Sequence, residues 1–200
     1  MMIIDPKEVV KNNLREGETL QSVMKNLQDL AARHMLRHFD GLLHNLHLPP
    51  SMPRDEFIAR YKIDEKVRRD YREEIFKHFV GYTGEIAVLG ALGCDWRGVY
   101  DSNDIAKFEI PDGKVNGFEY DVKTKYKDDD GLSVAESKIK YDFYILCYYR
   151  SRLVRIAGYA LKEQLLRGRR FSYKDGTSAR ALRLDDKLHS FDEFLRLFKH

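Results

Sequence analysis

Apolar residues within the stretch 19–47 recur mostly at spacings of three and four positions. This period predicts an amphipathic helix, either continuous or broken at Gly41. Three prolines at positions 49, 50 and 53 then mark a linker, and the charged stretch 54–80 predicts a second helical segment. Residues 1–64 are therefore expected to form an N-terminal helical region that serves in dimerisation or as a substrate clamp.

The pattern changes at Gly81, from which glycines punctuate the chain as far as Gly93. Residues 85–92 predict a short buried helix that ends at this last glycine. Four runs rich in β-branched and aromatic residues follow, and such runs predict strands. They are residues 105–110, 115–123, 141–149 and 153–160.

Turn signals separate the predicted strands. The tripeptide 111–113, Pro-Asp-Gly, predicts the turn of a hairpin between the first two strands, and Asn116-Gly117 predicts a second turn or a bulge. Residues 161–166 favour another helix, and residues 179–184 favour a late edge strand. Residues 65–200 are therefore expected to form an α/β domain with a mixed central sheet flanked by helices.

The composition is that of one catalytic domain. The 200 residues are 43% hydrophobic and 12% aromatic, enough for one substantial core. No window reaches the run of about 18 apolar residues of a membrane helix, and residues 1–10 lack the apolar core of a signal peptide. We therefore expect a soluble, cytoplasmic protein without a membrane partner. Cys94 and Cys147 form no Cys-x-x-Cys pair, so neither a disulfide framework nor a cysteine zinc site is indicated.

Charge is distributed unevenly along the chain. The net charge of +3 is small, but residues 150–200 hold 13 Lys and Arg against 6 Asp and Glu. A basic C-terminal quarter is suited to contacts with phosphates. A solvated surface accounts for the same count equally well.

An aspartate and a lysine stand two positions apart in the second predicted strand. Asp121 and Lys123 therefore lie on the same face of the sheet. A lone Asp-x-Lys is more often a surface ion pair. Its context here favours a site, because Asp104 opens the preceding predicted strand and Glu85 begins the helix before it.

Three converging carboxylates repel one another unless a cation or a proton neutralises them. Oxygen ligands with open positions suit Mg²⁺ or Mn²⁺, which bind substrate phosphate directly and lower the pKa of a bound water. The Lys123 ammonium group would orient that water or balance charge in the transition state. The expected catalytic residues are thus Glu85, Asp104, Asp121 and Lys123.

The order of Glu85, Asp104 and the triplet Asp121-Val-Lys123 resembles the PD-(D/E)XK nuclease superfamily over about residues 75–165. In that family a glutamate of the first core helix often follows glycines, an acid begins the second core strand, and an acid and a lysine follow on the third. The resemblance implies a restriction-endonuclease-like fold. It also implies metal ligation by the three carboxylates and by the backbone carbonyl of Val122.

The chain departs from the family pattern at the second acid. Asn103 precedes Asp104, so the proline of the family name is absent there. Asp101 competes with Asp104 for the same role. We favour Asp104 because the predicted strand begins directly after it, at Ile105.

The implied activity is divalent-metal-dependent hydrolysis of DNA phosphodiester bonds by an endonuclease. The apolar stripe from Leu20 to Leu46 predicts a homodimer, because cutting both strands of a duplex favours two active sites related by a two-fold axis. A Holliday-junction resolvase or an exonuclease would use the same chemistry. Two rivals are a nucleic-acid-binding module that has lost turnover and an unrelated α/β protein in which Asp121 and Lys123 form an ordinary ion pair. The candidate DNA-binding residues near the site are Lys125, Lys127, Lys138 and Lys140, and for Lys125 and Lys127 the alternative is a charged edge strand protected against aggregation. A predicted loop adds Arg167, Arg169 and Arg170, for which the alternative is a role in solubility.

Overall fold

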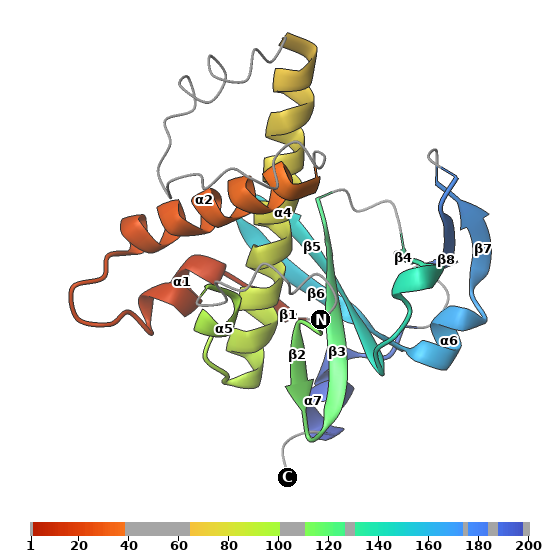
Figure 1. Cartoon of the computed structure of the whole chain (residues 1–200). Helices are drawn as coiled ribbons and strands as arrows, with labels where there is room; N and C mark the ends of the chain where they lie inside the picture. Colours follow the sequence, from red (N-terminus) through yellow and green to blue (C-terminus); the bar gives the residue numbers. More distant parts are fainter. Residues whose placement is uncertain are drawn as a thin grey trace.

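The computed structural model describes residues 2–38, 65–100, 111–126, 131–173, 176–183 and 188–197. The helices are α1 (Pro6–Lys11), α2 (Leu20–His38), α4 (Glu65–Leu92), α5 (Arg97–Tyr100), α6 (Lys162–Leu166) and α7 (Phe191–Leu197), with a 3₁₀ helix η2 at Glu136–Lys138 (Figure 1). The strands are β1 (Met2–Ile4), β2 (Gly113–Val115), β3 (Phe118–Lys125), β4 (Leu132–Ala135), β5 (Phe143–Arg150), β6 (Leu153–Leu161), β7 (Arg169–Ser172) and β8 (Ser178–Leu182).

The strands form two sheets. A five-stranded sheet has the order β1-β6-β5-β3-β2, in which β3 and β5 are parallel and the other pairs antiparallel. A three-stranded antiparallel sheet has the order β4-β8-β7. The predicted α/β class, with a mixed central sheet flanked by helices, is confirmed.

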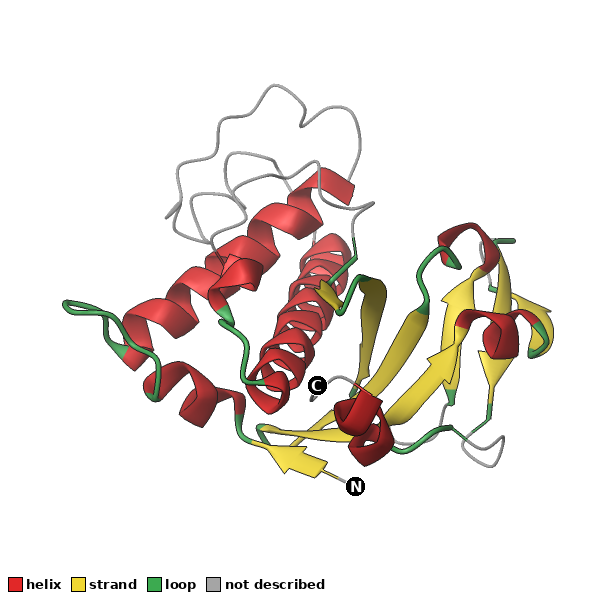
Figure 2. Ribbon diagram, turned by 90° about the horizontal axis from the view of Figure 1, so that it is seen from below, coloured by secondary structure: helices red, strands yellow, loops and turns green. Residues whose placement is uncertain are grey.

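The five-stranded sheet is covered on both faces (Figure 2). Side chains of β3, β5 and β6 such as Val122 and Ile145 pack on one face against Ala87 of α4 and Phe194 of α7. The residues that alternate with them in β5 pack on the other face against β4, β8 and α6. Alternate residues of β5 are buried on opposite faces because successive strand side chains point to opposite sides.

Helix α4 is a single helix, where the sequence predicts separate helical segments over 54–80 and 85–92. Its glycines lie inside the helix, and Gly84 is required by a close approach to β3 described below. The predicted end at Gly93 is confirmed. Gly93 has φ +70°, and the N–H groups of Gly93 and Cys94 donate to the carbonyls of Gly90 and Leu89, which is the Schellman arrangement.

The N-terminal part packs against the sheet and α4. Strand β1 pairs with β6 and extends the main sheet, and the apolar face of α2, including Val23 and Leu27, packs against Tyr82 and Ile86 of α4. This part of the apolar stripe, which motivates the homodimer prediction, is thus covered within the chain. The remainder of the stripe and the linker at 48–53 lie outside the described residues. No described helix combines the length and apolar composition that a membrane span requires.

The hairpin before the candidate site differs from its prediction. Gly113 already belongs to β2, and the turn lies at Asn116-Gly117 between the paired residues Val115 and Phe118. Asn116 and Gly117 have φ +50° and +86°, and this two-residue turn with positive φ at both positions matches the twist of the flanking strands. The predicted strand 105–110 lies outside the described residues.

Two predictions in the C-terminal quarter are also wrong in part. The predicted late edge strand corresponds to β8, which lies in the middle of the small sheet between β4 and β7. Arg169 and Arg170, predicted in a loop, are the first residues of β7. β8 lies in the middle of the small sheet because the neighbouring β7 pairs with one of its edges and β4, from a distant part of the chain, pairs with the other.

Candidate active site

Among the described strands, β3 has a partner at only one edge where the predicted Asp-x-Lys pair begins. Strand β2 pairs with β3 only as far as Tyr120, whereas β5 pairs with the other edge from Tyr120 to Lys125. From Asp121 onward, the described residues therefore provide no strand partner at the β2 side. A backbone N–H at this edge therefore pairs with a side chain instead of a described strand.

Asp112 occupies this edge. It directly precedes β2, and its Oδ2 accepts a hydrogen bond of 2.6 Å from the Val122 N–H. The next residue must be small, because a Cβ on Gly113 would lie 2.2 Å from the Tyr120 hydroxyl oxygen. Since the N–H and C=O of a strand residue point to the same side, the Val122 carbonyl also faces this edge.

Asp121 and Lys123 form a close ion pair on the face of β3 opposite Val122. The Lys123 Nζ donates to Oδ1 of Asp121 at 2.9 Å and lies 2.6 Å from Oδ2. The second contact lies off the direction of a hydrogen bond, so the buried Oδ2 has no hydrogen-bond partner. Asp121 is only 8% exposed, which distinguishes this pair from an ordinary surface ion pair.

Helix α4 brings Glu85 to the same place. A Cβ on Gly84 would lie 1.8 Å from the Thr124 Oγ1, so the helix backbone meets β3 at this point. Glu85 follows directly in the helix, and its carboxylate interacts with the charges of Asp112, Asp121 and Lys123. The Gly-Glu sequence is therefore explained by contact between helix and strand.

The carboxylates destabilise one another's ionised forms. Burial first, and then the charges of Asp112 and Asp121, raise the pKa of Glu85 well above its usual value. Burial and the charge of Asp121 raise the pKa of Asp112 to about 7. Burial also raises the pKa of Asp121, although the Lys123 ammonium group opposes this shift.

The pKa of Lys123 is also raised, which for an amine favours the charged form. Burial alone would lower the pKa of this amine, but Asp121, Asp112 and Glu85 outweigh it and raise the pKa. The amine is therefore a cation at neutral pH. One ammonium group faces three carboxylates, and an added cation would relieve the remaining repulsion.

The donor set fits a hard divalent cation. Carboxylate and carbonyl oxygens are the ligands of Mg²⁺ and Mn²⁺, and the buried Oδ2 of Asp121, which accepts no hydrogen bond although Lys123 lies 2.6 Å away, is one such oxygen. Among the described residues, no three His, Cys, Asp or Glu side chains are arranged as a ready-made metal site. Mg²⁺ does not require one, because it keeps several waters and binds through one or two carboxylates.

Asp112 was missed by the sequence reasoning. The sequence signal was the pair Pro111-Asp112, nine residues before Asp121, which we interpret above as a turn. Asp104 and its competitor Asp101 lie outside the described residues. Glu85, Asp121 and Lys123 are brought together, and the acid that joins them in the described structure is Asp112.

The predicted basic residues nearest the site differ in their surroundings. The Nζ of Lys125 donates to the Gly131 carbonyl at 2.6 Å, which ties β3 to the start of β4. Lys138 and Lys140 are exposed, and the charge of Lys138 acts on Asp121. Lys127 lies outside the described residues.

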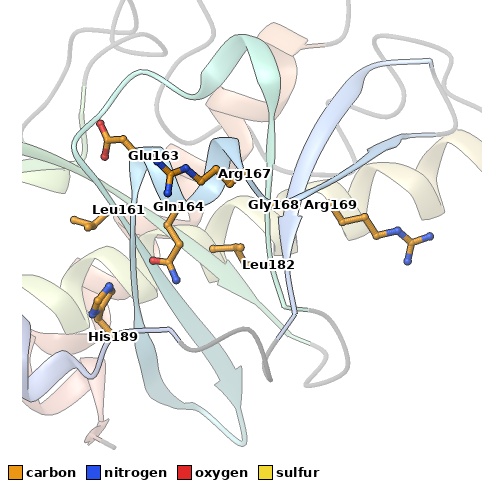
Figure 3. A pocket seen from close by; sticks show the side chains of 8 residues that line it. All are labelled: Leu161, Glu163, Gln164, Arg167, Gly168, Arg169, Leu182 and His189. Atoms are coloured by element: carbon orange, nitrogen blue, oxygen red, sulfur yellow. The ribbon is translucent and has the colours of Figure 1, made fainter.

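The predicted arginines lie away from the carboxylates. Arg170 and Arg180 both pair with Glu136, at 3.1 and 2.7 Å. Arg167 and Arg169 line a pocket of about 700 Å³ between α6 and the β7–β8 hairpin, where Arg169 points away from the other labelled side chains (Figure 3). None of the four residues of the carboxylate site lines this pocket.

The arrangement unites an acidic pair at the edge of β3, a glutamate from the covering helix and a half-buried lysine. Such a site is suited to holding a divalent cation beside a fixed positive charge. Comparison of the chain with protein-family models, with curated proteins and with solved structures finds no match.

Proposed function

We propose that the protein is a divalent-metal-dependent nuclease, an endonuclease that hydrolyses DNA phosphodiester bonds. The observation that carries this proposal is the cluster of Glu85, Asp112 and Asp121 around the Lys123 ammonium group at the edge of β3. A binding module or a structural protein gains nothing from clustered carboxylates that raise one another's pKa.

We further propose membership of the PD-(D/E)XK superfamily, with the restriction-endonuclease-like fold. Pro111-Asp112 followed by Asp121-Val-Lys123 supplies the proline and the acid that give the family its name. This alignment assigns the second acid to Asp112 instead of Asp104. It also gives Gly84-Glu85 a physical reason, since the glycine lets the helix carry the glutamate onto β3.

Each residue has a distinct part in the proposed reaction. Asp112, Asp121 and the Val122 carbonyl would hold Mg²⁺ or Mn²⁺, with Glu85 on the helix side. The ion when bound activates a water and shares the negative charge of the phosphate. Lys123, kept protonated by its neighbours, donates to a phosphate oxygen and stabilises the charge that develops there.

Cleavage assays test the proposal directly. The purified protein is incubated with supercoiled plasmid, linear duplex, single-stranded DNA and a four-way junction, with Mg²⁺, Mn²⁺ or EDTA. We expect metal-dependent nicking of the plasmid, because an endonuclease needs no free end. Cleavage from ends alone would indicate an exonuclease, and cleavage of the junction alone a resolvase.

Variants of the site, with a matched control, show whether the cleavage comes from this protein or from a contaminating nuclease. Asp121→Ala and Lys123→Ala should each lower cleavage by about 100-fold or more. Lys114→Ala removes an exposed lysine that pairs with Glu119 on the neighbouring strand and should leave cleavage unchanged. DNA binding without cleavage under every condition would instead favour a binding module.

A further inference from the structure

The hydroxyl group of Tyr144 forms three hydrogen bonds with one backbone turn, residues 138–141. It accepts the N–H of Lys140 at 2.6 Å and the N–H of Tyr141 at 3.1 Å. It donates to the carbonyl oxygen of Lys138 at 3.0 Å. The side chain is completely buried, so these bonds within the protein replace solvent at the hydroxyl.

This turn stands beside the proposed metal ligand. Tyr144 of β5 pairs in register with Asp121 of β3, so the two side chains project from the same face of neighbouring strands about 4.8 Å apart. The Tyr144 hydroxyl therefore holds residues 138–141 over the Asp121 carboxylate. The charges of Lys138 and Asp121 also interact, which agrees with this placement.

Other contacts fix the turn from its far side. The Nζ of Lys162 donates to the Lys140 carbonyl at 3.0 Å. Asp142 and Glu119 exchange two hydrogen bonds, from the Asp142 N–H to the Glu119 carbonyl at 3.0 Å and from the Glu119 N–H to the Asp142 Oδ2 at 2.8 Å. The turn is therefore ordered before any substrate binds, which lowers the entropic cost of using it.

This turn presents two exposed lysines, Lys138 and Lys140, and Lys138 is the one whose charge acts on Asp121. Lys123, the other lysine near Asp121, contacts both carboxylate oxygens and has its charge balanced within the protein. The Lys138 side chain is exposed, in contrast to the buried carboxylate beside it. A phosphate that approaches Asp121 from solvent would therefore meet the ammonium group of Lys138.

We propose that Tyr144 is a positioning residue, which holds Lys138 beside Asp121 so that the lysine binds the phosphate of the substrate to be cleaved. This inference rests on the proposed nuclease function. It adds a second cation to the site and assigns a role to a tyrosine that contacts no substrate. Because Tyr144 acts through Lys138, replacing Tyr144 should lower activity only in a protein that retains Lys138.

A double-mutant cycle on the full chain tests this dependence. Tyr144→Phe and Lys138→Ala should each lower kcat/KM for plasmid nicking by about 10-fold or more. The double variant should be no slower than Lys138→Ala alone, since the two residues form one unit. Lys138→Arg, which keeps the charge, should recover most of the activity.

Binding supplies a readout that does not depend on turnover. The affinity for a duplex oligonucleotide is measured in EDTA at several salt concentrations. Lys138→Ala should reduce the slope of log Kd against log salt by about one, as expected for one lost phosphate contact. Lys11→Ala, on the exposed side of α1, is the control for the loss of a charge and should leave this slope unchanged.

The outcomes separate this inference from the function on which it rests. Absence of metal-dependent cleavage by the wild-type protein overturns the proposed function and, with it, this role for Tyr144. If the wild type cleaves DNA but the two substitutions lower kcat/KM independently, by about 100-fold together in the double variant, the positioning role alone is overturned. If thermal melts show that Tyr144→Phe does not fold, the Lys138→Ala variant still tests the inference. An unchanged kcat/KM and an unchanged salt slope in that variant would overturn it.

Discussion

The Asp112 carboxylate takes the place of a strand partner for Val122, whose N–H it accepts at 2.6 Å. This hydrogen bond ties an acid from the start of β2 to the middle residue of the Asp121-Val-Lys123 triplet. It also keeps the charge of Asp112 within reach of Asp121 and Glu85. The bond therefore holds acids that are distant in sequence together at the edge of β3.

Neutralising Asp112 should stabilise the metal-free protein at alkaline pH. Its pKa is about 7 in the folded chain and about 4 in an unfolded one, so folding is penalised once the group ionises. The free energy of unfolding should fall as pH rises from about 4 to about 7 and then level off. Asp112→Asn keeps an oxygen for the Val122 N–H and should gain about 1–3 kcal/mol at pH 8.

Urea denaturation in EDTA at pH 4 and pH 8 measures this difference. The gain of Asp112→Asn over the wild type should be present at pH 8 and nearly absent at pH 4. Glu16→Gln, at an exposed loop position, controls for the change in net charge. A gain in unfolding free energy that is the same at both pH values, or larger at pH 4, would contradict the destabilisation of the folded protein by ionised Asp112.

Added Mg²⁺ or Mn²⁺ should raise the melting temperature, and more at pH 8 than at pH 5. The ion competes with protons for carboxylates whose pKa values are raised, so it binds best where they are ionised. Differential scanning fluorimetry with a metal titration checks this. In Asp121→Asn the metal-dependent rise should be lost, and a rise that persists unchanged would place the ion elsewhere.

Two glycines of α4 should respond in opposite ways to alanine. Gly84→Ala places a Cβ against Thr124 and should destabilise the protein by about 1–3 kcal/mol while displacing Glu85. Gly81→Ala lies in the same helix with open space around it and should stabilise by about 0.5–1 kcal/mol. Chemical denaturation of the two variants measures both. Equal effects would contradict the close approach of α4 to β3.

The strands that the sequence predicts well are those rich in β-branched and aromatic residues. β3, β5 and β6 have this composition and are predicted from local pattern, as is the helix end at Gly93. β1 is only three residues long and forms by pairing with β6 at the far end of the chain, which no local pattern reveals. β4 was missed for the same reason, since its partner β8 is also distant in sequence. β7 pairs with its neighbour β8, but its sequence Arg-Arg-Phe-Ser is too polar to predict a strand.

The sequence predicts those site residues whose place follows from the pattern of their own helix or strand. Asp121 and Lys123 follow from strand alternation, and Glu85 follows from its place after a glycine. Asp112 depends on where β2 stops along β3, which is a matter of register between two strands. Its Pro-Asp-Gly sequence is equally that of a turn, so local propensity pointed to the wrong role.

The choice between Asp112 and Asp104 as the second acid can be made in a cleavage assay. Asp112→Asn should abolish metal-dependent nicking, because it removes a proposed ligand while keeping the hydrogen bond to Val122. Asp104→Asn should retain activity within about threefold, as most substitutions away from a site do. Loss of activity in Asp104→Asn with full activity in Asp112→Asn would reverse the assignment.

The most direct measurement is anomalous diffraction from crystals of the protein grown with Mn²⁺. The account predicts an anomalous peak about 2.1 Å from the Oδ2 of Asp121, in contact with Asp112 and the Val122 carbonyl, and beside the Lys123 ammonium group. Mn²⁺ absent from these oxygens at concentrations that support DNA cleavage, or bound only at other residues, would contradict it.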